Sequence, residues 1–217
     1  MSIMPMPDLQ AEPEGIHLSA LDAYIAKPGT LTGVGFWPRA GARIIDQIIH
    51  YLIAICSGFL FGALLRFVAA LRHTSVRGML GYRKLGGIAL YIFALLASVA
   101  FQAICEGIHG SSPGKRLFSM VVVQEDGSRC RHGSAWIRSF AYFIDSLFFG
   151  LIGYFSMEKT PQQQRHGDEW AHTIVYRRSD VAAQNQRSMG QFTLALFLAI
   201  LAYSALMILG MLVNLMG

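Results

Sequence analysis

Long apolar segments alternate with polar segments along the chain. Residues 47–65, 85–105 and 190–217 contain no Asp, Glu, Lys or Arg. Because about 20 apolar residues suffice to cross the hydrocarbon core, each of these segments predicts a transmembrane helix. A fourth apolar segment, 139–157, contains one charged residue, Asp145. It either spans the membrane or enters and leaves on one side, a path tolerated only where protein or a water-filled cavity covers the backbone.

The polar segments contain two short β-like runs, Met120–Gln124 and Thr173–Arg177. An Asp-Gly pair, which is typical of turns, follows the first run at Asp126. We expect the two runs to pair as a small cytoplasmic sheet. The predicted fold class is an all-α membrane protein with three to four transmembrane helices, a small cytoplasmic β element and, if 139–157 does not span, a re-entrant segment.

Composition divides the chain into three parts. Residues 1–34 are acidic and contain several prolines, and they lack the basic start and apolar core of a secretory signal, so we expect a mobile tail. Residues 35–178 form the predicted membrane domain. Residues 179–217 form a linker and a C-terminal transmembrane helix.

The distribution of Lys and Arg depends on the path of the fourth segment. If 139–157 is re-entrant, the tail and both polar loops share one side, and 13 of the 18 basic residues lie there against five in the connector 66–84. If it spans, the division is eight against ten and decides nothing. Positive charge marks the cytoplasmic side, so the re-entrant form predicts a cytoplasmic N-terminus.

Overall composition agrees with a membrane protein. Hydrophobic residues make up 53% of the chain and charged residues 14%, and the mean hydropathy is +0.43. The net charge of +5 suits cytoplasmic loops beside anionic lipid, and we expect no nucleic-acid partner. The three cysteines and seven histidines lack metal-site spacing. Without a nucleophile elbow, catalytic triad or cofactor fingerprint, we expect no metal, no cofactor and no enzymatic activity.

One signature occurs twice, 99 residues apart. Residues 36–57 and 135–156 both contain W-x-R-x-x-A-x-x-I-D, and eight of 21 aligned positions are identical. Each copy places a carboxylate, Asp46 or Asp145, in an apolar helix, where it costs about 2.5–3.5 kcal/mol near the bilayer centre. Internal repeats with polar residues at this depth are common in transporters.

The charged residues of the repeat have two interpretations. Arg39, Arg43 and Asp46 lie on one helical face, and Arg43 is close enough in sequence to pair with Asp46. The second copy has Tyr142 in place of Arg43, so Asp145 needs a partner from elsewhere. These side chains form either structural ion pairs that hold the helices together or a site for an ion or proton.

Within one copy, Arg and Asp are seven residues apart, which is about 10 Å along a helix and long for direct contact. We therefore expect the two repeat helices to contact each other and to exchange partners. Arg39 would pair with Asp145, and Arg138 with Asp46.

Four motifs occur in a particular order along the chain. They are G-F-W-P-R at 35–39 leading into Asp46, S-P-G-K-R-L at 112–117, R-H-G-D at 165–168 and A-H-T-I-V at 171–175. Together they resemble the RDD family of bacterial membrane proteins, and the resemblance covers about residues 35–178.

The resemblance implies a multi-pass protein of the bacterial inner membrane, with transport and sodium/proton exchange proposed for some members. The family is named for one arginine and two aspartates. Arg39 and Asp46 match the first two, and the second aspartate corresponds to either Asp145 or Asp168.

From the residues themselves, Gly167-Asp168 indicates a turn with a capping side chain, and Lys115 and Arg116 are expected at the lipid surface.

Two functions remain open at this point. The leading hypothesis is a small carrier of ions or of a small ligand, working as a homo-oligomer because few helices of one copy are available to line a pathway. Its polar site would combine Asp46 and Asp145. The alternative is a non-catalytic accessory or assembly subunit of a larger membrane complex, in which the charges hold the repeat together and the terminal helix docks to a partner.

Overall fold

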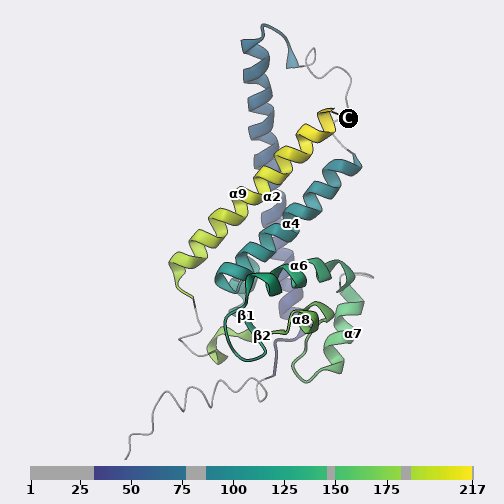
Figure 1. The fold of residues 1–217 in the computed structure, drawn as a ribbon, viewed down its shortest axis with the longest axis vertical. Coiled ribbons are helices and arrows are strands. Elements are labelled where there is room, and N and C mark those ends of the chain that lie inside the picture. The colour runs from purple at the N-terminus through teal and green to yellow at the C-terminus, as the bar shows by residue number, and fades with distance from the viewer. Residues whose placement is uncertain (1–31, 77–86, 146–149, 182–186, 217) are drawn as a thin grey trace, which may run out of the picture.

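Three long helices dominate the structure (Figure 1). The computed structural model describes residues 32–76, 87–145, 150–181 and 187–216. Helices α2 (Phe36–Leu71), α4 (Ile88–His109) and α9 (Met189–Met216) are long and apolar enough to cross a membrane. They cover all or most of each of the three segments predicted to span, so that prediction is confirmed. The predicted mobile tail lies almost wholly outside the described residues.

The described parts of the fourth apolar segment belong to two separate helices. They divide between α6 (His132–Asp145) and α7 (Leu151–Lys159), and Gly150 before α7 has a left-handed φ of 87°. The described part of α6 is 14 residues or about 21 Å long, short of the roughly 30 Å hydrocarbon core. In Figure 1, α6 runs across the direction of α2. Within the described residues, three helices qualify as spans.

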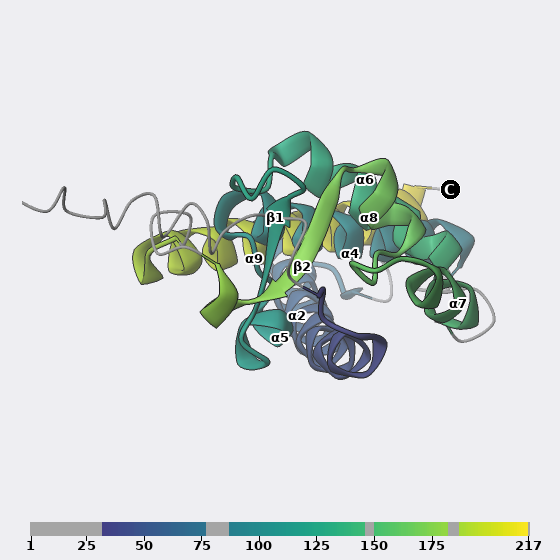
Figure 2. The ribbon, with the colours of Figure 1, turned by 90° about the horizontal axis from the view of Figure 1, so that it is seen from below.

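The elements between α4 and α9 gather at one end of the long helices. Besides α6 and α7 they comprise α5 (Pro113–Leu117), α8 (His166–Trp170), a short 3-10 helix (Arg178–Asp180) and the strands. We call described residues 110–181 the cap. The start of α2, the end of α4 and the start of α9 all lie at the cap end (Figures 1 and 2). Both polar loops therefore lie at the same end, as the re-entrant topology required.

The cap contains a two-stranded antiparallel sheet. Strands β1 (Met120–Gln124) and β2 (Thr173–Arg177) pair with Val122 opposite Val175, which confirms the predicted pairing. The segment before α2 joins them, because the Val34 N–H donates to the Val175 carbonyl at 2.8 Å.

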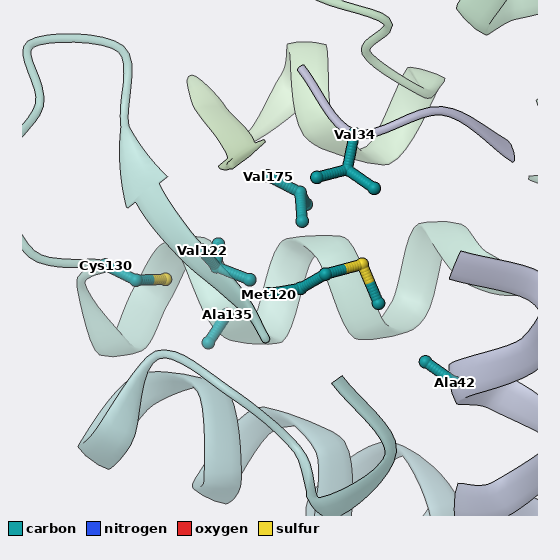
Figure 3. Packing of buried hydrophobic residues seen from close by; sticks show 7 residues of the cluster. All are labelled: Val34, Ala42, Met120, Val122, Cys130, Ala135 and Val175. Carbon is teal, nitrogen blue, oxygen red and sulfur yellow. The ribbon is translucent and has the colours of Figure 1, made fainter. Parts of the chain in front are cut away.

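A small apolar cluster ties this sheet to the helices (Figure 3). Met120 and Val122 of β1 and Val175 of β2 are buried with Ala42 of α2 and Ala135 of α6. Figure 3 shows the Met120 side chain extending toward Ala42. The cap is therefore packed on α2 through its own core.

Small residues let α4 and α9 approach closely along their length. Ala97 and Ala199 are fully buried between them, together with Phe101 and Tyr203. Without a hydrophobic driving force in lipid, close packing of small residues is the usual basis of helix association.

This topology predicts the result of cysteine labelling in intact cells. We expect Asp126→Cys and Glu158→Cys, both on exposed cap positions, to react from the same side of the membrane. His73→Cys, exposed just after α2, should react from the opposite side. Each variant is made in a Cys56→Ser background, and that background alone is the control for labelling of Cys105 and Cys130. Reaction of positions 126 and 158 from opposite sides would contradict the topology.

Candidate functional site

Five buried charged side chains form a continuous chain where the cap meets the long helices. In order, they are Lys115, Glu106, Arg138, Asp168 and Arg39. Arg138 Nε lies 3.0 Å from Glu106 Oε2, and its Nη1 lies 2.5 Å from Asp168 Oδ1. Arg39 pairs with the other Asp168 oxygen, and Lys115 pairs with Glu106. None of these five side chains is more than 9% exposed.

Each member of this chain comes from a different element. Arg39 lies in the first turns of α2 and Glu106 near the end of α4. Lys115, Arg138 and Asp168 belong to α5, α6 and α8. The remaining donors of Arg39 are satisfied by backbone, Nε by the Val34 carbonyl at 2.8 Å and Nη2 by the Gln163 carbonyl at 2.9 Å. The five ion-paired residues therefore connect the spans α2 and α4 to the cap helices α5, α6 and α8.

Asp168 is held as a carboxylate by the arginines around it. Burial alone would raise its pKa, but Arg138 and Arg39 outweigh burial and hold the pKa well below its usual range. Burial would likewise lower the pKa of Arg138, and Asp168 and Glu106 raise it instead. Both partners are thus charged at every physiological pH.

Lys115 differs from these pairs. Burial lowers the pKa of its ammonium group to about 8, although Glu106 beside it favours the charged form. Its predicted position at the lipid surface is wrong, because it lies inside the protein. Arg116, the next residue, is the more exposed of the two and lies over the Phe192 ring.

The two aspartates of the matching segments make corresponding contacts. Asp46 accepts a hydrogen bond from the N–H of Gly114 at 2.7 Å, and Asp145 accepts one from the N–H of Gly167 at 3.3 Å. Each glycine lies at the start of a five-residue helix, α5 or α8, and each helix leads into a strand. The carboxylates therefore fix the N-terminal ends of these short helices, where unpaired N–H groups and the helix dipole favour negative charge.

Neutral donors complete the surroundings of Asp46. Gln102 of α4 donates at 3.0 Å and Ser112 at 2.6 Å. Nearby, Ser98 of α4 lies 3.1 Å from His50 Nδ1 and also accepts from Arg43 at 3.4 Å. Polar side chains thus connect α2 to α4.

The prediction that the arginine of each repeat copy pairs with the aspartate of the other copy is wrong. Arg39 pairs with Asp168 instead of Asp145, and Arg138 pairs with Asp168 and Glu106 instead of Asp46. The reason is that both repeat carboxylates are occupied by the glycine N–H groups of the cap. The other partner of Asp145 is His166 at 3.2 Å, and both aspartates line one cavity together with residues of α2 and α6.

Arg43 and Arg165 share an aromatic neighbour. The Arg43 guanidinium lies 4.2 Å from the centroid of the Tyr142 ring, and that of Arg165 lies 5.8 Å from it. The predicted pairing of Arg43 with Asp46 does not occur, because Arg43 extends to Ser98 and Tyr142. Within the described residues, neither of these two arginines is in an ion pair.

All of these charged groups line one cavity of about 540 Å³. Its wall holds five cations and four carboxylates: Arg39, Arg43, Lys115, Arg138, Arg165, Asp46, Glu106, Asp145 and Asp168. The structure thus brings together all six site residues predicted from sequence, namely Arg39, Arg43, Asp46, Arg138, Asp145 and Asp168. Within the described ranges, His, Cys, Asp and Glu form no cluster that would hold a metal ion.

Sequence reasoning missed three members of the site, Glu106, Lys115 and Arg165. Glu106 follows directly after the second apolar segment, where a carboxylate at a helix end does not stand out. Lys115 and Arg165 lie in motifs that were recognised, but nothing local indicates that they point inward. Only the folded cap brings them to the cavity.

Gly114 and Gly167, whose N–H groups bind the two aspartates, fit closely against their neighbours. An added methyl group at either position should therefore lower stability. A Cβ at position 114 would overlap the Ala42 carbonyl oxygen, and one at position 167 would lie 2.8 Å from the Ala141 Cβ. We expect Gly114→Ala and Gly167→Ala to lower stability by about 1–3 kcal/mol, the usual cost of overpacking. Thermal unfolding in detergent measures this, with Gly133→Ala as the control because its Cβ meets nothing within 4 Å. Unchanged melting in both variants would contradict the packing.

Removing the shared carboxylate should be more damaging than removing an exposed one. Asp168→Asn would leave Arg39 and Arg138 without a negative partner, and breaking a buried pair costs about 3–5 kcal/mol. We expect a large loss of folded, extractable protein. Asp126→Asn, on an exposed turn of the same cap, is the control. Equal yields and melting temperatures for the two variants would show that the buried pairs do not hold the cap.

Comparison with known proteins places the chain in a family. The model of the RDD family matches residues 34–172, which include Arg39, Asp46, Asp145 and Asp168. No curated protein and no solved structure matches the chain. The family match covers well over half of the sequence and contains α2, α4 and most of the cap. The chain therefore belongs to the RDD family and is a multi-pass membrane protein.

Proposed function

We propose that this protein binds a small anion in the cavity between the cap and the long helices and carries it across the membrane. The observation that supports this proposal is the excess of positive charge at the buried site. The chain of five residues contains three cations and two carboxylates. An uncompensated buried charge is costly, and a bound anion would remove the imbalance.

The other charged groups of the cavity do not offset this excess. Asp46 and Asp145 are matched in number by Arg43 and Arg165, but each carboxylate is already engaged by backbone N–H groups of the cap. Arg43 and Arg165 are left with an aromatic ring as their main neighbour. A site for Na⁺ would instead need a carboxylate with free oxygen ligands.

Guanidinium groups suit this task. A planar guanidinium can donate two parallel hydrogen bonds to two oxygens of a carboxylate, phosphate or sulfate. The Tyr142 ring beside Arg43 and Arg165 helps to orient these two guanidinium groups. The cavity volume of about 540 Å³ lies within the range of roughly 300–1,000 Å³ typical of small-molecule sites.

The internal repeat is part of the proposal. Asp46 and Asp145 occupy corresponding positions of the repeat, and the strands that follow the two capped helices pair with Val122 opposite Val175, each eight residues after the glycine that its aspartate binds. This supports a duplicated unit whose two copies face each other across the cavity. Inverted or parallel repeats around a central site are a common basis of alternating access.

We place the cap in the cytoplasm of a bacterial cell, below the inner membrane. The cap end and the start of α2 contain most of the chain's Lys and Arg residues, and positive charge marks the cytoplasmic side. A homo-oligomer would supply the further helices that a transport pathway needs.

The second candidate is an accessory subunit of a membrane complex. Helix α9 favours it, because Leu194, Phe197 and Leu201 are exposed on a helix without charged residues. Such a face serves for lipid or for a partner helix. In this case no small ion would stabilise the protein, and other polypeptides would purify with it in fixed stoichiometry.

Thermal unfolding in detergent at constant ionic strength tests the proposal. We expect sulfate and inorganic phosphate to raise the melting temperature, because a ligand that binds only the folded state stabilises it. Arg43→Gln should raise the half-saturating sulfate concentration at least about tenfold, since a charge-assisted hydrogen bond contributes about 1.5–3 kcal/mol. Arg66→Gln, on the exposed side of α2, is the matched control. Stabilisation by Na⁺ but not by these anions would overturn the proposal in favour of a cation carrier.

The state of Lys115 predicts how binding depends on pH. Below its pKa of about 8 the ammonium group is charged and attracts the anion, and above this pH it is neutral. Stabilisation by sulfate, which does not titrate here, should therefore decline between pH 7 and pH 9. Lys115→Arg should remove the decline. Arg43→Gln should weaken binding at every pH without changing the pH range in which the decline occurs. A pH-independent response of the unmodified protein would contradict this role of Lys115.

A further inference from the structure

The cavity is not charged throughout. Its charged residues lie at the cap end, whereas Ala54 of α2, Ala94, Leu95 and Val99 of α4 and Met207 of α9 line it beyond them. These apolar residues belong to the membrane-spanning part of the helices. One continuous cavity therefore offers a positive end and an apolar end.

The cavity as a whole is long enough for a head group with an alkyl chain. Glu106 and Tyr91 both line the cavity and are 15 residues apart on α4. This separation corresponds to about 22 Å along the helix axis. The apolar stretch of the cavity, from Val99 to Tyr91, is eight residues or about 12 Å long. This is most of the roughly 15 Å that one leaflet contributes to the hydrocarbon core.

The cavity also opens toward the surroundings of the spans. Tyr51 on α2 and Tyr91 on α4 line it, and they are 64% and 65% exposed. At the level of the membrane, an exposed side chain faces lipid. A molecule already dissolved in the bilayer can therefore reach the cavity from the side, between α2 and α4.

The arrangement of the helices explains this opening. α4 and α9 are joined by fully buried small residues such as Ala97 and Ala199, whereas α2 meets α4 through the polar pairs Asp46–Gln102 and His50–Ser98. Close packing on one side and side-chain bridges on the other leave the space next to α2.

We infer that the anion bound by this protein is an amphiphile, with a phosphate or carboxylate head group at the arginines and an alkyl chain between α2 and α4. This inference rests on the proposed anion site and adds the chemical class of its ligand. The head group would lie against Arg43 and Arg165 beside Tyr142, and the chain would lie against Ala54, Ala94 and Val99. Anionic phospholipids of the bacterial membrane and their single-chain derivatives have this chemistry.

A titration with three defined probes tests the inference. Purified protein in detergent is titrated with dioleoylphosphatidylglycerol, with dioleoylphosphatidylcholine and with glycerol 3-phosphate, and thermal unfolding is measured. We expect the anionic lipid to half-saturate at a concentration at least tenfold lower than glycerol 3-phosphate, and the zwitterionic lipid to have little effect. Arg43→Gln together with Arg165→Gln should remove the response to both anionic probes.

A variant of the apolar wall separates the chain from the head group. Ala94→Trp would place a large apolar side chain in the apolar part of the cavity. It should abolish the additional affinity for the lipid and leave the response to glycerol 3-phosphate unchanged. Ile92→Trp, on the exposed side of the same helix, is the matched control. If Ala94→Trp does not fold, Ala54→Leu on the opposite wall serves the same purpose.

Each alternative outcome has a distinct meaning. Equal affinity for glycerol 3-phosphate and the anionic lipid, or an unaffected lipid response in the wall variants, would overturn the inference while the anion site stands. A lipid response that persists in the double arginine variant would also overturn it, because the lipid would then bind around the outside of the helices. No response to any anionic probe would overturn both the inference and the proposed function.

Discussion

Two arginines share the buried carboxylate of Asp168, and the rest of the site depends on this contact. Arg39 brings the start of the first span to it, and Arg138 brings the helix that carries the second copy of the signature. Because charges this deeply buried are tolerated only with partners, the cap cannot shift on the helices without leaving one of them unpaired. Glu106 and Lys115 extend the same constraint to α4 and α5. These ion pairs hold five elements together around the charged end of the cavity.

Asp46 and Asp145 have a different task from the one that their position in apolar segments indicates. Each carboxylate accepts the N–H of a glycine at the start of a short helix of the cap. They orient α5 and α8, and through these helices they place Lys115 and Asp168 in the chain of charges. A carboxylate near a membrane is thus stabilised by backbone dipoles as well as by arginine. On the proposed function, the aspartates shape the site and the arginines bind the ligand.

The sequence predicts the spans and the strands well, because both are determined by local patterns. Uncharged apolar runs predict α2, α4 and α9, and the two valine-containing runs predict β1 and β2 with their pairing. Six of the nine charged residues that line the cavity are also predicted from the repeat and the motifs. Their partners are not, because Arg39 and Asp168 are 129 residues apart and no local signal distinguishes Asp168 from Asp145 as the partner. The inward position of Lys115 is invisible for the same reason, since it depends on where α5 packs against α2.

The most direct test of the account is to locate an anion in the cavity. Anomalous diffraction from crystals soaked in selenate would show the position of the selenium atom without reference to any activity. The account predicts a peak in the cavity within hydrogen-bonding distance of Arg43 or Arg165, and loss of that peak in the variant that lacks both arginines. A cavity without a peak at a selenate concentration that labels exposed arginines, or a peak that persists in the variant, would contradict it.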